Sequence, residues 1–344
     1  MAGKSNIEWT GHTWNPLAGC GVLTPGCTNC YAMKMAARLE AMGQELYVGL
    51  TKPSKAGAVW TGVMRQAPDH VLLAPLRRKI PTTYFVNSMS DLFHESVPDE
   101  WIDKVFAVMA LSPQHTFQVL TKRAQRMRDY CSDATLRDRI SRFMWKISER
   151  RTDHLHGGYP LRNVWLGVST ERQQEADERI PLLLQTPAAI RFISAEPLLG
   201  PINLGCIRFG ASNRGFLDAR NGRTDYPGPN AHPDLAKLNW VIVGGESGPK
   251  ARPMHPAWAR SLRDQCKAAG VPLFFKQWGN WKPLDQFETQ VINSAGKHAV
   301  VREDGRFTID TDIADPPRAV FTFNMGKKGA GRLLDGVEHD GMPG

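Results

Sequence analysis

Seven short runs of apolar, β-branched and aromatic residues recur along this chain, each followed by a polar or glycine-containing turn. The runs do not alternate apolar with polar residues, which favours strands that are buried on both faces, as in a parallel sheet. They are Thr13–Gly19, Thr83–Ser88, Thr116–Leu120, Asn163–Val168, Ile190–Ser194, Trp240–Gly244 and Pro272–Lys276.

Segments with helical spacing of apolar residues lie between these runs. They are Ala32–Met42, Pro98–Leu111, Arg123–Cys131, Ala134–Glu149, Gln173–Gln185 and Pro256–Ala269. Alternation of strand and helix predicts an α/β fold with a mainly parallel sheet. Seven such units indicate a TIM-like (βα) barrel, complete or partial, and a doubly wound open sheet is the alternative.

Two stretches interrupt this rhythm and set the predicted domains. Residues 205–234 are rich in Gly, Asn, Pro and Arg, and we interpret them as a long insertion in a barrel that spans residues 1–285. Residues 286–344 are predicted to form a small C-terminal extension. The insertion interleaves basic and aromatic side chains, a combination that suits contact with nucleic acid. These side chains are Arg208, Phe209, Arg214, Phe216, Arg220 and Arg223.

The charge and the apolar runs limit the partners of the chain. Its 344 residues carry 43 Lys and Arg against 34 Asp and Glu, and the net charge of +9 favours an anionic partner such as a nucleic acid or nucleotide. Apolar runs fall short of the roughly 18 residues that a membrane helix needs. The first residues lack the apolar core of a signal peptide. We therefore expect a cytoplasmic protein with no membrane partner.

Three cysteines lie close together, directly after the first strand-like run and before the first helix. Cys20, Cys27 and Cys30 occupy a loop-forming stretch, whereas the other three cysteines are scattered. In a reducing cytosol such a cluster favours metal binding or catalysis over disulfides. A [4Fe–4S] cluster with one open iron is one interpretation. A structural Zn site, with His12 or His94 as the fourth ligand, is the second, and buried thiols without metal are the third.

The string TWNPLAGC…TPGCTNCYA resembles a phage-associated family of uncharacterised three-Cys-motif proteins. The resemblance continues in order over nearly the whole chain, through FVNSMSDLFHESVP, FQVLTKR, NVWLGVSTE, RFISAEPLLGPI, WVIVGGESGPKARPM, FFKQWG and GKKGAGRLLDG. It implies a protein similar to radical S-adenosylmethionine enzymes, which keep their cluster in the loop after the first strand. Those enzymes usually show C-x3-C-x2-C, whereas the first gap here is six residues.

Polar residues follow most of the strand-like runs, where a (βα) barrel would gather its site. The resemblance implies that the loop after the second strand binds the methionine part of S-adenosylmethionine, with Asp91 accepting from its ammonium group. It also implies that the Ser-x-Glu after the fourth strand binds ribose hydroxyls. The plain alternatives are helix caps and turns. The candidate cofactor-binding residues are Asn87, Ser88, Ser90, Asp91, Ser169, Glu171, Gly244, Gly245 and Glu246.

Four further charged residues at strand ends are candidate catalytic residues. Lys122 and Arg123 suit a carboxylate or phosphate group. Glu196 lies between a buried strand and a proline turn, a position that seldom serves stability alone. Lys276 ends an apolar run, so we expect it to pair with Glu196 or Glu246.

Three functions remain open at this stage. The first is a radical S-adenosylmethionine-like enzyme that acts on a nucleotide or nucleic acid and needs an electron donor. The second is a basic nucleic-acid-binding phage protein with structural Zn in the cysteine loop. The third is a metal-dependent hydrolase, with Asp91, Glu171, Glu196 and Glu246 as ligands or bases.

Overall fold

The computed structural model describes residues 2–55, 57–148, 158–209, 215–225, 235–287, 297–309 and 319–344. The chain divides into two compact units, neither of which is one continuous stretch. The first comprises Met1–Val168 with Gln185–Arg191, and the second comprises Ser169–Leu184 with Phe192–Gly344. The predicted boundary at residues 285 and 286 stays a prediction.

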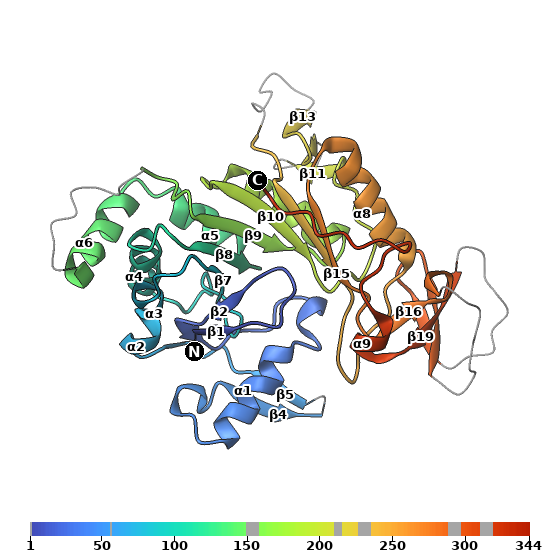
Figure 1. Cartoon of the computed structure of the whole chain (residues 1–344), viewed down its shortest axis with the longest axis horizontal. Coiled ribbons are helices and arrows are strands. Elements are labelled where there is room, and N and C mark those ends of the chain that lie inside the picture. Colours follow the sequence, from blue (N-terminus) through green and yellow to red (C-terminus); the bar gives the residue numbers. More distant parts are fainter. Residues whose placement is uncertain are drawn as a thin grey trace. The chain divides into compact units, whose positions relative to one another are not determined.

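The first unit is built on strands in the order β1-β2-β7-β8-β9 (Figure 1). These are β1 (Ala2–Lys4), β2 (His12–Trp14), β7 (Thr83–Val86), β8 (Thr116–Thr121) and β9 (Val164–Ser169). β1 pairs antiparallel with β2, and the following pairs are parallel. Trp14, Val86 and Val119 are fully buried, as expected for apolar strands covered on both faces.

Four helices of the first unit follow expected segments closely, and the short helices α2 and α3 were not expected. They are α1 (Tyr31–Ala41), α2 (Asp69–Leu72), α3 (Ala74–Arg77), α4 (Asp99–Ala110), α5 (Ala124–Cys131) and α6 (Leu136–Ser148), with single 3-10 turns η1 (Pro25–Cys27) and η2 (Glu45–Tyr47). α4 begins directly after Pro98 with two acidic residues in its first turn, which suits the positive end of a helix dipole. The expected end of α6 at Glu149 lies outside the described residues.

The first expected strand, Thr13–Gly19, is wrong as a single element. β2 ends at Trp14, and β3 (Leu17–Ala18) pairs instead with β6 (Arg65–Gln66) in a separate antiparallel ladder. Pro16 lies between them and has no backbone N–H for a ladder, so the strand is interrupted there. The hairpin of β4 (Thr51–Ser54) and β5 (Gly57–Trp60), which was not expected, packs against α1.

The second unit contains parallel strands in the order β10-β14-β15: β10 (Ile190–Ala195), β14 (Trp240–Gly244) and β15 (Leu273–Gln277). Its helices are α7 (Gln173–Gln185) and α8 (Pro256–Ala269). The ends of α8 are fixed by the capping residue His255, whose Nδ1 accepts from Ala257 N at 3.1 Å, and by left-handed Gly270 (φ 65°).

Near the chain end, residues 339–341 run antiparallel along β15. Phe275 N donates to His339 O, and Gly341 N donates to Leu273 O, both at 2.9 Å. The indole Nε1 of Trp240 donates to Gly341 O at 2.7 Å. This C-terminal segment therefore covers the backbone edge of β15.

Smaller sheets complete the second unit. β11 (Ile207–Phe209), β12 (Gly215–Asp218) and β13 (Arg223–Asp225) form an antiparallel sheet within the expected insertion. β16 (Trp281–Pro283), β17 (His298–Arg302), β18 (Phe307–Ile309) and β19 (Ala319–Asn324) form another, with η3 (Leu284–Gln286) and α9 (Gly326–Ala330) beside it. Residues 210–214 and 226–234 of the insertion, with Arg214, lie outside the described residues, as do residues 288–296 and 310–318 of the predicted C-terminal extension.

The fold is therefore mixed α/β with mostly parallel strands, as the sequence predicts. Within the described part of the chain, no strand pairing closes the strands of either unit into a barrel. The complete TIM-like barrel is thus not seen. Within the same residues, none of the helices combines the length and apolar character required to cross a bilayer.

Candidate metal and cofactor site

The three clustered cysteines come from one loop of the first unit. Cys20 follows β3, Cys27 ends the η1 turn, and Cys30 directly precedes α1. Backbone bonds hold the loop, because Cys27 N donates to Thr24 O at 2.8 Å and Cys30 N donates to Cys27 O at 3.2 Å. Cys27 is buried, while Cys20 and Cys30 are half-buried and pack against the apolar cluster under α1.

A hydrogen-bonding group lies beside each of these sulfurs. The Nη1 atom of Arg123 is 3.7 Å from Cys20 Sγ, and the Oγ1 atom of Thr24 is 4.0 Å from Cys27 Sγ. Burial raises the pKa of Cys20 to about 12, the charge of Asp91 adds to this, and Arg123 opposes it. Burial also raises the pKa of Cys30, against the backbone N–H groups of Ala32 and Met33 at the start of α1. The negative charge of Cys27 also raises the pKa of Cys30, so these two thiols lie close enough to interact electrostatically.

The sequence-predicted residues Asp91 and Arg123 meet beside Cys20. Arg123 Nη1 lies 3.2 Å from Asp91 Oδ2, and Arg123 Nε lies 3.2 Å from Glu95 Oε1. Asp91 is fixed in turn, since it accepts from Thr121 Oγ1 at 2.6 Å and from the backbone N of Lys122 at 3.0 Å. Burial lowers the pKa of Arg123, but the neighbouring negative groups outweigh it and raise the pKa above its ordinary value.

Gly21 lets this group of charges approach the cysteine loop. A Cβ atom on Gly21 would lie 2.9 Å from His94 Nε2 and 3.3 Å from Arg123 Nη2. His94, which the sequence offers as a zinc ligand, is therefore next to the loop. Burial and the charge of Arg123 lower the pKa of His94. The other candidate, His12, lies on β2 with its ring 5.9 Å from that of Tyr84.

The predicted cofactor-binding loop after β7 lies against the segment that leads to Cys20. Ser88 Oγ donates to Asn15 Oδ1 at 3.1 Å, and Ser90 Oγ donates to Leu17 O at 3.0 Å. Asn87 has a left-handed backbone (φ 61°), and its buried Nδ2 has no hydrogen-bond partner among the residues described. This buried donor is the feature of the loop that leaves a polar group for a ligand to satisfy.

In the second unit, the predicted residue Glu171 is fully buried in an ion pair. Its Oε2 lies 3.2 Å from Nη1 of Arg179, which is also fully buried and donates to Ser169 O at 2.7 Å. Ser169 is itself buried. The predicted ribose contact of Ser169 and Glu171 stays a prediction. The structure pairs Glu171 with Arg179, which the Ser-x-Glu pattern does not reveal.

Glu196 and Lys276 pair as expected from the sequence. Glu196 Oε1 lies 3.1 Å from Lys276 Nζ, and Ser194 Oγ donates to Glu196 Oε2 at 3.1 Å. Ser194 belongs to β10 and Lys276 to β15, while Gly244 ends β14. A Cβ on Gly244 would lie 2.5 Å from Glu196 Oε1, so the carboxylate occupies the space that this glycine leaves.

We expect Gly244→Ala to lower the free energy of unfolding by about 1–2 kcal/mol, since Glu196 must move and lose its contact with Lys276 or Ser194. Urea denaturation measures this. In a Glu196→Ala background the same glycine substitution should cost little, because the clash is gone. Equal costs in both backgrounds would show that the carboxylate is not what limits this position.

Glu246 and the neighbouring Gly245 make contacts within the second unit that account for both residues structurally. Glu246 is buried, and Arg252 Nη2 and Nε donate to its two oxygens at 2.6 and 2.8 Å. A Cβ on Gly245 would lie 2.0 Å from the carbonyl oxygen of Trp278. The close approach of these two chain segments therefore explains a glycine here without any ligand, and the predicted cofactor role of Gly245 and Glu246 stays a prediction.

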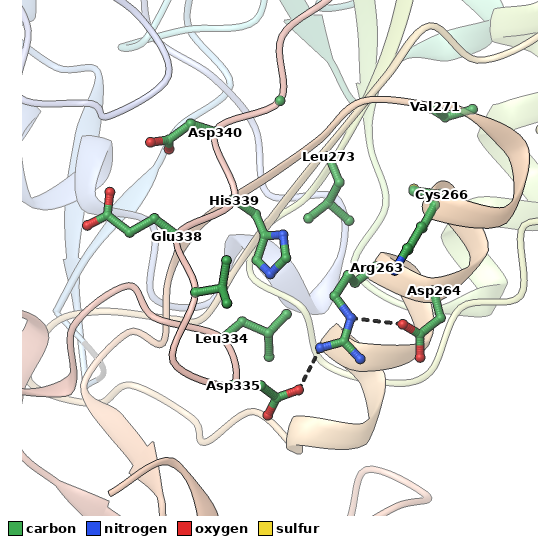
Figure 2. A pocket seen from close by; sticks show the side chains of 13 residues that line it. Arg263, Asp264, Cys266, Val271, Leu273, Leu334, Asp335, Glu338, His339 and Asp340 are labelled. Carbon is green, nitrogen blue, oxygen red and sulfur yellow. Dashed lines mark hydrogen bonds and ion pairs between the residues drawn. The ribbon is translucent and has the colours of Figure 1, made fainter. Parts of the chain in front are cut away.

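A pocket of about 690 Å³ opens elsewhere in the second unit, between α8, β15 and residues 334–341. Figure 2 shows Arg263 of α8 bridging Asp264 and Asp335, with the ring of His339 among the lining side chains. Burial lowers the pKa of His339. The sequence-predicted site residues are not part of this lining, so the pocket is separate from the candidate site.

The acidic groups that the hydrolase hypothesis names are held in ion pairs, and that hypothesis stays a prediction. Within the described ranges, no three His, Cys, Asp or Glu side chains are grouped so that they could hold a single metal ion. The four carboxylates that this hypothesis needs are each paired with a cation, namely Arg123, Arg179, Lys276 and Arg252. The sequence did not reveal these pairs beyond the Lys276 expectation, because the partners lie on other turns or elements.

A model of the family described as protein of unknown function (DUF5131) matches residues 4–343. The chain belongs to this family. No curated protein and no solved structure matches it. The chemistry proposed for this DUF5131 protein therefore rests on its own residues.

Proposed function

We propose that this DUF5131 protein is an iron–sulfur enzyme of the radical S-adenosylmethionine kind, active on a nucleotide or nucleic acid. Cys20, Cys27 and Cys30 would hold a [4Fe–4S] cluster. The observation that carries the proposal is that one loop brings together three thiols, each with a hydrogen-bonding group beside it: Arg123, the hydroxyl of Thr24, and backbone N–H groups. Metal-bound thiolates carry negative charge and are commonly supported by such donors.

A [4Fe–4S] cluster and a single zinc ion require different spacings of the thiolates that bind them. A tetrahedral zinc ion holds each thiolate at about 2.3 Å, so its ligands must be closely grouped. No such group of three is found in the described part of the chain. In a cluster the thiolates bind different irons and stand further apart. A zinc ion bound by all three cysteines would therefore need them more closely grouped than the structure has them.

The residues around the loop have separate tasks in this proposal. When reduced by a one-electron donor, such a cluster supplies the electron that breaks a C–S bond of S-adenosylmethionine, giving methionine and a deoxyadenosyl radical. Asn87 offers its unpartnered Nδ2 as a donor to the bound cofactor, and Ser88 and Ser90 hold that loop against the cysteine segment. Asp91 acts chiefly by holding Arg123.

The proposal also covers the type of barrel, the cellular compartment and the charge of the substrate. We take the mostly parallel sheet as a partial (βα) barrel, in a protein of the reducing cytosol, where free cysteines stay available to metal. The net charge of +9 supports an anionic substrate.

Anaerobic reconstitution tests the proposal. The protein should turn brown and contain iron and sulfide in near-equal amounts, and Cys30→Ala should lose both. The control Cys206→Ala, which removes an exposed thiol of the second unit, should keep them. Dithionite and S-adenosylmethionine should then yield deoxyadenosine, and an oligonucleotide or nucleotide substrate should increase its rate. Colourless protein with one zinc would overturn the iron–sulfur assignment in favour of the nucleic-acid-binding alternative.

A further inference from the structure

Arg123 stands beside Cys20 as a charged donor with a fixed direction. Its Nη1 atom is 3.7 Å from Cys20 Sγ, and its side chain is only 6% exposed. The hydrogen-bonding groups at the other two sulfurs are uncharged, namely the hydroxyl of Thr24 at Cys27 and backbone N–H groups at Cys30, although the charge of Lys122 also acts on Cys30. The three positions are therefore electrostatically unequal.

Two carboxylates hold the guanidinium in place. Asp91 is buried and takes Nη1 at 3.2 Å, the same atom that faces Cys20. Glu95 takes Nε at 3.2 Å, and its own side chain is 62% exposed. A planar guanidinium anchored at two of its nitrogens cannot turn freely, so its contact with Cys20 is built into the fold.

We infer that Arg123 is a positioning residue that sets the reduction potential of the cluster carried by Cys20, with Glu95 moderating it. The inference rests on the proposed function. Hydrogen bonds to the cluster sulfurs and positive charge nearby stabilise the reduced, more negative state, which raises the potential. Glu95 works in the opposite direction, because it shares the guanidinium and adds a negative charge.

Variants of both residues give shifts of opposite sign. Arg123→Met should move the midpoint to a more negative potential, and Arg123→Lys should move it less, since the charge stays but the anchored fork is lost. Glu95→Gln should move the midpoint to a more positive potential. Glu100→Gln is the matched control, because Glu100 is 63% exposed and pairs with Lys104 at 3.2 Å, outside this group of charges.

The measurement is a redox titration of the reconstituted full chain with dithionite, followed by electron paramagnetic resonance of the one-electron-reduced cluster. A shift of 59 mV corresponds to a tenfold change in the ratio of reduced to oxidised protein at a fixed potential. A tenfold change with Arg123→Met, absent in Glu100→Gln, is the expected result.

Unchanged midpoints in the loaded Arg123 variants would overturn the inference while leaving the proposed function intact. If Arg123→Met does not fold or load, Glu95→Gln decides alone, and a shift no larger than that of Glu100→Gln counts against Arg123. A wild-type protein that takes up no iron or sulfide overturns the proposed function and this inference with it.

Discussion

Arg179→Met should lower the free energy of unfolding by about 3 kcal/mol, because it leaves the carboxylate of Glu171 buried without its cation. Both side chains are fully buried, and their atoms lie 3.2 Å apart. Breaking such a pair costs about 3–5 kcal/mol. We expect the lower end, since Nε and Nη2 of Arg179 are already buried without acceptors among the described residues. Urea denaturation followed by tryptophan fluorescence measures the change.

The control is Arg128→Met, which removes a partly exposed pair with Asp129 on α5 and should cost less than about 1 kcal/mol. Glu171→Gln separates the structural role from the sequence-predicted one. Loss of stability with unchanged S-adenosylmethionine binding supports the structural role. Unchanged stability with lost cofactor binding would instead favour the ribose contact.

Deleting residues 339–344 is expected to cost about 2–4 kcal/mol and to promote self-association. Three hydrogen bonds are lost, those of Phe275 N, Leu273 O and Trp240 Nε1, and each contributes about 0.5–1.5 kcal/mol. The deletion also exposes the backbone edge of β15, and an unpaired strand edge readily pairs with another chain. Denaturation and size-exclusion chromatography at several protein concentrations measure the two effects.

Deleting only residues 342–344 is the matched control, since the bonds to β15 and Trp240 come from His339 and Gly341. This shorter deletion should leave both stability and the elution volume unchanged. A longer deletion that behaves like the shorter one would show that the C-terminal segment is not needed to cover the strand.

Much of the fold follows from local patterns. The apolar runs predict β7, β8, β9, β10, β14 and β15, because strands buried on both faces need apolar residues at successive positions. Caps predict the ends of α8, whose His255 and Gly270 act as the sequence suggests. The hairpin of β4 and β5 could not be predicted this way, since all its residues except the buried Trp60 are half-buried or exposed, and it is stabilised by packing against α1.

The candidate site is predictable only in part. Parallel strand ends meet at one edge, which is why the Asn87–Asp91 loop and Arg123 could be placed near the cysteines from sequence alone. The pairing of Glu171 with Arg179, and the anchoring of Arg123 by Glu95, depend on how turns of chain pack in three dimensions. Residue charge and secondary-structure propensity do not determine which charged side chains lie close together. A charged residue in a buried ion pair therefore cannot be told from a surface charge by sequence alone.

The chain passes back and forth between the two compact units, and this limits how either unit could be exchanged by recombination. The chain leaves the first unit at Val168, contributes Ser169–Leu184 to the second, and returns for Gln185–Arg191 before leaving again. A gene segment for residues 1–168 thus omits a piece of the first unit, and one for residues 192–344 omits α7. A single recombination point therefore cannot transfer one complete unit without also carrying a piece of the other.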